Sequence, residues 1–187
     1  MYPITEQAFQ AARVRLSRYA IECAARLARE TGFGFEESTV APSTFDEVRK
    51  EYDECRRTHR AFRVWNGASD NTAYTSKEAN WSFRFWHDCV SHGAHGLTFD
   101  LYDELKSGNE WVRKIAGRFG VDSVEAWIAY ADTCGESLYA HEHGGLFPND
   151  QLGFVHEALL VGSAYQCPWD VIDAVRAACG PHQSVTI

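Results

Sequence analysis

Apolar side chains recur at a helical period between Thr5 and Glu30, and this pattern limits the chain to an architecture built on helices. The period is close to 3.6 residues, as expected for a helix with one buried face. Thr5 is suited to cap the start of this helix and Gly32 to end it. The apolar set consists of Phe9, Ala12, Leu16, Tyr19, Cys23 and Leu27.

Helix-capping residues predict further helices along the rest of the chain. Thr44 with Glu47 and Thr75 with Glu78 have the spacing of a capping box. The helices expected from such signals cover residues 44–60, 75–93, 99–105, 111–119, 122–140, 150–160 and 168–180. No run alternates between apolar and polar residues as a half-buried strand does. The sequence therefore predicts an all-α, single-domain helical fold over residues 1–187.

Composition supports one globular domain in a reducing compartment. A chain of 187 residues with 45% hydrophobic content can bury a sizeable core without disulfides. Its 6 cysteines include no C-x-x-C pair, and the N-terminus lacks the basic and apolar pattern of a signal peptide. We therefore expect reduced thiols and a cytoplasmic location.

The net charge and the apolar runs of the chain indicate which kinds of partner to expect. A formal net charge of −8 works against non-specific attraction to nucleic acid. The basic segments 56–63 and 113–118 are expected to be solvated helix faces. No apolar run is long enough to cross a membrane. These features favour a small-molecule substrate over a nucleic acid or a membrane.

Residues that could bind a metal are concentrated in the middle of the sequence. His87 and His92 lie on one predicted helix, and Asp132 follows on another. Two histidines and one carboxylate can hold iron on one face and leave the other open for oxygen and substrate. We therefore predict His87, His92 and Asp132 as metal ligands, with Fe(II) as the expected ion and zinc or manganese as alternatives. Glu136 is an alternative carboxylate ligand.

The spacing of the two histidines raises a difficulty. Residues five apart on an ideal α-helix point about 140° away from each other, which opposes a shared metal. The competing set Asp88, His92 and His95 has spacings of four and three, which would share one helical face. The sequence leaves both sets open. Asp88 and Glu136 are the predicted catalytic residues beside the metal.

His87-x4-His92 followed by the carboxylate of Asp132 resembles the metal-binding pattern of the aromatic amino acid hydroxylases. Those enzymes are non-haem iron(II) oxygenases with an α-rich catalytic domain, and their carboxylate is normally glutamate. The resemblance covers about residues 83–136. It implies an oxygenase acting on a small or aromatic organic substrate, held by aromatic residues such as Phe85, Trp86 and Phe99.

A longer stretch, roughly residues 83–154, is similar to an uncharacterised family of phage and mobile-element proteins. The shared features are a His-Asp-x3-His motif and a series of short motifs after it in the same order. In this chain they are His87-Asp88 with His92, Gly96 with Phe99, Glu104, Asp132-Thr133-Cys134-Gly135-Glu136, and Asp150-Gln151-Leu152-Gly153. This resemblance implies a shared site and names no reaction.

Two other functions fit the same residues. The doublet His87-Asp88 resembles that of HD-type phosphohydrolases, in which His59 and Asp132 would complete the metal site and a metal-bound hydroxide would attack a phosphate ester. The second alternative is a non-enzymatic, phage-associated interaction protein. It would bind a partner through an exposed apolar patch.

Overall fold

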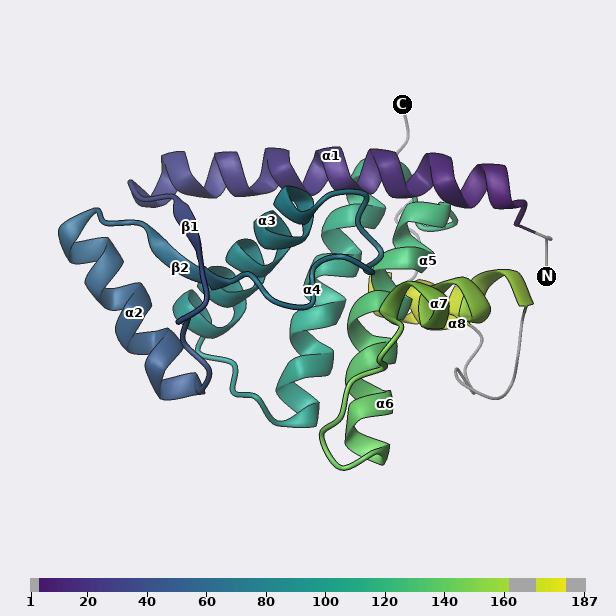
Figure 1. Cartoon of the computed structure of the whole chain (residues 1–187). Helices are drawn as coiled ribbons and strands as arrows, with labels where there is room; N and C mark the ends of the chain where they lie inside the picture. The colour runs from purple at the N-terminus through teal and green to yellow at the C-terminus, as the bar shows by residue number, and fades with distance from the viewer. Residues whose placement is uncertain (1–3, 162–170, 181–187) are drawn as a thin grey trace. The chain divides into compact units, whose positions relative to one another are not determined.

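A computed structural model describes residues 4–161 and 171–180 of the chain. Within this part the protein is mostly helical, which confirms the predicted all-α class (Figure 1). The first half contains α1 (Glu6–Thr31), β1 (Phe35–Ser38), α2 (Phe45–Thr58), β2 (Phe62–Trp65), α3 (Lys77–His87) and the π-helix η1 (Asp88–Ala94). The second half contains α4 (Leu101–Phe119), α5 (Val124–Tyr130), η2 (Ala131–Gly135), α6 (Glu136–Glu142), α7 (Gln151–His156), η3 (Glu157–Val161) and α8 (Val171–Cys179).

The chain forms two compact units whose boundaries fall inside α1 and α4. Unit 2 consists of residues 13–107, and unit 1 consists of residues 1–12 and 108–187. Both predicted histidine ligands belong to unit 2. Asp132 and Glu136 belong to unit 1. A single domain stays a prediction.

A small sheet in unit 2 was not predicted. β1 and β2 pair in parallel, with Phe35 opposite Phe62 and Ser38 opposite Trp65. Parallel neighbours need a crossover connection, and α2 supplies it, as Figure 1 shows. Each strand has only four residues. Such a strand is too short to show the alternation by which strands are recognised in a sequence.

The core of unit 2 is built around Phe85 on α3. Its ring is fully buried and contacts Phe33, Phe35 and Phe62, so the sheet and α3 share one aromatic cluster. Phe85 was predicted to line a substrate pocket, and this prediction is wrong because core aromatic residues surround its ring. Trp86 is also buried.

Several predicted helix starts are confirmed by their hydrogen bonds. Thr5 accepts a bond from the amide of Ala8, and Asp150 accepts one from the amide of Gly153. The capping box of Thr44 and Glu47 is complete. Two other starts lie one residue later than predicted: Ser76 caps α3 in place of Thr75, and Ser123 caps α5 in place of Asp122. The predicted start at Pro168 lies outside the described residues.

The helix α4 continues through Gly108, where the sequence predicted a break between two helices. A Cβ at Gly108 would lie 2.6 Å from the Sγ of Cys134 and 3.0 Å from the hydroxyl of Thr133. The glycine therefore permits close packing of α4 against η2 within unit 1. It does not end the helix.

The described residues contain three π-helical segments: η1 and η3 follow the ends of α3 and α7, and η2 lies between α5 and α6. A π-helix has i→i+5 hydrogen bonds, is rare, and occurs mostly as single turns within α-helices, frequently at functional sites. Two of the three contain predicted site residues: His92 lies in η1 and Asp132 in η2. The predicted helices 75–93 and 122–140 are thus continuous, but the first changes its winding in its last turns and the second in its middle.

Membrane insertion by a helix has no support in the described part of the chain. No helix there combines the length and the apolar composition that a membrane span requires.

Candidate metal centre

The π turn of η1 removes the difficulty in the spacing of the two histidines. His87 is the residue directly before η1, and His92 lies five positions later within it. Because a π turn pairs residues i and i+5, it brings side chains five apart to one side of the helix. The ring centroids of His87 and His92 are 4.6 Å apart. The sequence-based objection assumed a regular α-helix and does not apply.

Glu104, in the first turn of α4, is the carboxylate that joins the two histidines. Its helix begins with a cluster of side-chain caps: Asp100 accepts a bond from the amide of Asp103, and Asp103 accepts bonds from the amide and hydroxyl of Thr98. These bonds determine where the first turn of α4 starts. They thereby place Glu104, which follows Asp103 in the sequence.

A buried hydrogen bond connects the two elements that carry these residues. The hydroxyl of Ser107 on α4 donates to the hydroxyl of Ser91 on η1 at 2.7 Å, and both serines are fully buried. Ser91 directly precedes His92. This contact holds η1 beside the part of α4 that presents Glu104.

The three side chains form a group that could hold a metal ion. The Nε2 atoms of His87 and His92 lie 3.6 Å from the Oε2 and Oε1 atoms of Glu104, respectively. One ligand atom from each of the three residues lies within 4.8 Å of the other two. Metal bonds of about 2 Å place neighbouring ligand atoms roughly 3 to 3.5 Å apart, so the observed separations are close to those of a bound site.

The imidazole of His92 is oriented as a metal ligand would be. Its Nδ1 lies 2.7 Å from the carbonyl oxygen of Leu97. Because a carbonyl only accepts hydrogen bonds, Nδ1 carries the proton. Burial of the ring lowers the pKa of His92, and the nearby charge of His87 lowers it further. The neutral ring therefore keeps a lone pair on Nε2. This Nε2 atom is buried and has no hydrogen-bond partner.

His87 has a different electrostatic environment. Burial would lower the pKa of His87, but the hydrogen bonds with Asp88 and Glu104 outweigh it and raise this pKa to about 10. Without a metal, the ring is therefore an imidazolium held by two carboxylates. This ion pair accounts for the position of His87. The buried Nε2 of His92 still has no hydrogen bond.

The other candidates from the sequence lie outside this group of three. Asp88 contacts the Nδ1 atom of His87 at 3.2 Å, and His95 is exposed after the end of η1. His59 is an exposed residue that ends α2 with a left-handed backbone, and its Nδ1 lies 3.2 Å from the carbonyl oxygen of Gly32. Neither His95 nor His59 belongs to the group of His87, His92 and Glu104.

The two predicted acidic residues of unit 1 lie around η2. Asp132 is the second residue of this π segment, and Glu136 follows its end. Glu136 is buried and accepts a hydrogen bond from the side-chain amide of Gln151 at 2.9 Å. The roles of Asp132 as a ligand and of Glu136 as a ligand or catalytic residue stay predictions.

Aromatic residues lie beside the candidate metal site. The ring of Phe99 packs edge-on against His92 at a centroid distance of 4.5 Å and is itself partly exposed. Phe45, at the start of α2, packs edge-on against Phe99. Phe99, one of the three aromatic residues predicted beside the site, thus contacts a histidine of the group.

Glu104 completes the group but was not selected as a ligand from the sequence. It appeared there only among the motifs of the resemblance to the phage proteins. A signal that could have identified Glu104 is the group of helix-capping residues before it, because such side chains mark the start of a helix. These residues are Thr98, Asp100 and Asp103. They place Glu104 in a first helical turn shortly after the histidines.

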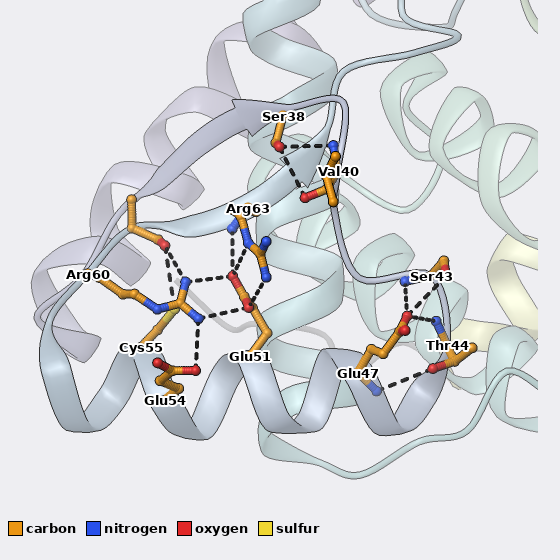
Figure 2. Close-up of polar contacts among 11 residues, drawn as sticks. Ser38, Val40, Ser43, Thr44, Glu47, Glu51, Glu54, Cys55, Arg60 and Arg63 are labelled. Atoms are coloured by element: carbon orange, nitrogen blue, oxygen red, sulfur yellow. Dashed lines mark hydrogen bonds and ion pairs between the residues drawn. The ribbon is translucent and has the colours of Figure 1, made fainter.

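A second polar cluster in unit 2 explains one of the basic segments. The buried carboxylate of Glu51 accepts hydrogen bonds from the guanidinium groups of Arg60 and Arg63, as Figure 2 shows. Arg60 also contacts Glu54. These contacts pair two of the four arginines in segment 56–63 with carboxylates.

A pocket of about 460 Å³ lies beside this cluster. Its lining includes the carboxylates of Glu47, Glu51 and Glu54 and the cations of Lys50 and Arg63. The lining therefore carries charges of both signs.

Comparisons of the chain with protein-family models, curated proteins and solved structures found no match.

Proposed function

We propose that His87, His92 and Glu104 bind one transition-metal ion and that the protein is a metal-dependent enzyme. The observation that carries this proposal is the buried Nε2 atom of His92, which lies 3.6 Å from Glu104 and beside His87 and has no hydrogen-bond partner. A buried nitrogen without a partner costs stability. A metal ion would remove this cost.

The ligand types favour iron(II) among the candidate metals. Two imidazoles and one carboxylate on one side of the ion are typical of non-haem iron oxygenases. Cys89 lies in η1 among these residues but is not part of the group, and burial raises the pKa of its thiol. The site therefore lacks the thiolate that is common in structural zinc sites.

We further propose that the reaction is an oxygenation of a small or aromatic organic substrate. Iron held by three protein ligands keeps positions open for oxygen and substrate. Phe99, beside His92 and partly exposed, would contact an apolar part of that substrate. Glu104 and His87 are partly exposed, so ligands can reach the site from solvent.

Elemental analysis after anaerobic purification tests the metal site. We expect about one iron per chain in the wild type and a loss of most of it in His92→Ala and Glu104→Ala. His95→Ala is the matched control, because His95 is exposed and lies three residues from His92. Wild-type protein that binds neither iron, zinc nor manganese would overturn the proposal.

Two further variants separate the competing roles. Asp132→Asn should retain metal if Glu104 is the carboxylate ligand, whereas a loss of metal would support Asp132. His59→Ala should also retain metal. If it does not, and the manganese-loaded wild type releases phosphate from nucleotides or phosphodiesters, the HD-type phosphohydrolase replaces the oxygenase. Oxygen uptake by the iron-loaded protein with small aromatic compounds, compared with the zinc-loaded protein, tests the reaction itself.

A further inference from the structure

The two histidines of the metal centre use their ring nitrogens in the same way. His92 donates from Nδ1 to the carbonyl oxygen of Leu97 at 2.7 Å, and the Nδ1 of His87 lies 3.2 Å from the Oδ1 atom of Asp88. Both Nε2 atoms face Glu104, one toward each of its oxygens. The arrangement leaves Nε2 as the metal-binding atom of both rings.

The two Nδ1 acceptors differ in kind. Leu97 contributes a backbone oxygen, which no substitution of its side chain removes. Asp88 contributes a carboxylate from the first residue of η1, next to His87 in sequence, and its side chain is 27% exposed. A carboxylate that accepts a hydrogen bond from a metal-binding histidine orients the ring and makes its other nitrogen a stronger ligand.

Charge also favours this role for Asp88. Glu104 brings one negative charge to the group, and the two imidazoles are neutral when both bind metal through Nε2. Asp88 adds a second negative charge beside His87. Together the two carboxylates balance the charge of a divalent ion.

We infer that Asp88 is a positioning residue of this centre, which holds the His87 ring with Nε2 toward Glu104 and offsets the charge of a divalent metal. This inference rests on the proposed metal site. It replaces the role of catalytic residue that the sequence suggested for Asp88, because its carboxylate is directed at the ring nitrogen that does not face Glu104.

Cobalt(II) titration of the purified, metal-free protein tests the inference. In Asp88→Ala we expect the affinity for cobalt to fall about 10- to 100-fold, the usual effect of losing such a partner. In Asp88→Asn, which keeps an acceptor oxygen but loses the charge, the fall should be smaller. Asp53→Ala, which removes an exposed carboxylate of α2 in the same unit, should bind cobalt like the wild type.

Spectra of the cobalt-saturated proteins separate positioning from direct coordination. If Asp88 only positions His87, saturated Asp88→Ala should keep the visible absorption bands of the wild type, because the ligands are unchanged. Nitrogen-15 signals of the histidine rings in the zinc-loaded wild type should show metal at Nε2 and a proton at Nδ1 of His87.

Three results would overturn the inference. An unchanged cobalt affinity in Asp88→Ala would show that the contact has no role in binding. Changed absorption bands, or a complete loss of cobalt as in His92→Ala, would make Asp88 a ligand. Zinc bound at Nδ1 of His87 would reverse the proposed orientation. A wild-type protein that binds no metal would instead refute the proposed function, so the two failures are distinguishable.

Discussion

At the scale of single residues, burial determines which polar side chains need a partner. The Nε2 atom of His92 is buried without one, whereas the buried carboxylate of Glu51 accepts hydrogen bonds from two arginines. An unsatisfied buried polar atom is costly, whereas a satisfied one is tolerated. The first residue therefore supports the proposed metal site, and the second is a structural anchor.

Glu51 should make the stability of the protein depend on acidic pH. Burial alone would raise the pKa of Glu51, but the hydrogen bonds from Arg60 and Arg63 outweigh it and lower this pKa from 4.5 to about 2. A carboxylate with a depressed pKa stabilises the fold above pH 4.5, and this contribution is lost as the pH falls toward 2. The difference corresponds to at most about 3 kcal/mol, reduced because both guanidinium groups are partly exposed.

Urea unfolding at pH 7 and pH 2.5 measures this contribution. We expect Glu51→Gln to be less stable than the wild type by roughly 1 to 3 kcal/mol at pH 7, with a smaller difference at pH 2.5. Glu54→Gln is the matched control on the same helix, since its side chain is far more exposed than that of Glu51 and its carboxylate pairs with Arg60. Its effect should stay below about 1 kcal/mol. Equal losses in both variants would contradict the anchoring role of Glu51.

At the scale of secondary-structure elements, helices were predicted well and changes in winding were not. Thr5, Thr44 and Asp150 identified helix starts because capping is a local interaction. The π turn of η1 depends on tertiary contacts: the ring of Tyr52 packs on Gly93, and Arg49 donates to the carbonyl oxygen of Gly93 at 2.6 Å. Such contacts cannot be inferred from the residues of one helix alone. For this reason the sequence left the ligand set open.

Gly93 should contribute to the proposed metal site, because it allows α2 to approach η1. A Cβ at this position would lie 2.7 Å from the ring of Tyr52. We expect Gly93→Ala to lower the free energy of unfolding by about 1 to 3 kcal/mol, as overpacking of a buried contact does. Since His92 is the preceding residue, the variant should also bind cobalt more weakly.

Gly117→Ala provides the control for this substitution. Gly117 lies in α4, and a Cβ there would meet nothing within 4 Å. Replacing a helical glycine by alanine then stabilises the fold by roughly 0.5 to 1 kcal/mol. Thermal unfolding and cobalt titration of both variants make the comparison. Wild-type stability and affinity in Gly93→Ala would contradict the close contact between Tyr52 and η1.

At the scale of the whole molecule, the all-α class was predictable and the grouping of residues was not. Helical periodicity is visible in the sequence, whereas the parallel pairing of β1 with β2 joins segments separated by the whole of α2. The residues of the candidate site were likewise not predictable as a group, because they come from different elements. Glu104 joins His87 and His92 because α4 lies beside η1, and this neighbourhood depends on buried contacts such as that between Ser91 and Ser107.

Metal binding should protect one of the two units from hydrogen exchange. His87, His92 and Glu104 all belong to unit 2. A ligand that binds only the folded state raises its stability by mass action, and segments close to the ligand should open less often. We therefore expect slower amide exchange in η1 and the first turn of α4 after zinc addition, measured by mass spectrometry. The amides of η2 should change less.

The His92→Ala variant is the control for this experiment, because zinc should leave its exchange unchanged. Strong protection of η2 in the wild type would instead support Asp132 or Glu136 as a ligand. Protection spread evenly over both units would point to zinc binding at other residues.

The winding of η1 has a consequence for the comparison of this protein with others. A π turn aligns residues five apart, and a regular α-helix aligns residues four apart. A helix with one residue fewer between the two histidines could therefore present the same pair of rings without any π turn. The extra residue is accommodated by the winding, and neither ligand has to move. Sequence patterns for this type of site should accept His-x3-His as well as the His-x4-His of His87 and His92, followed by a glutamate near the start of the next helix.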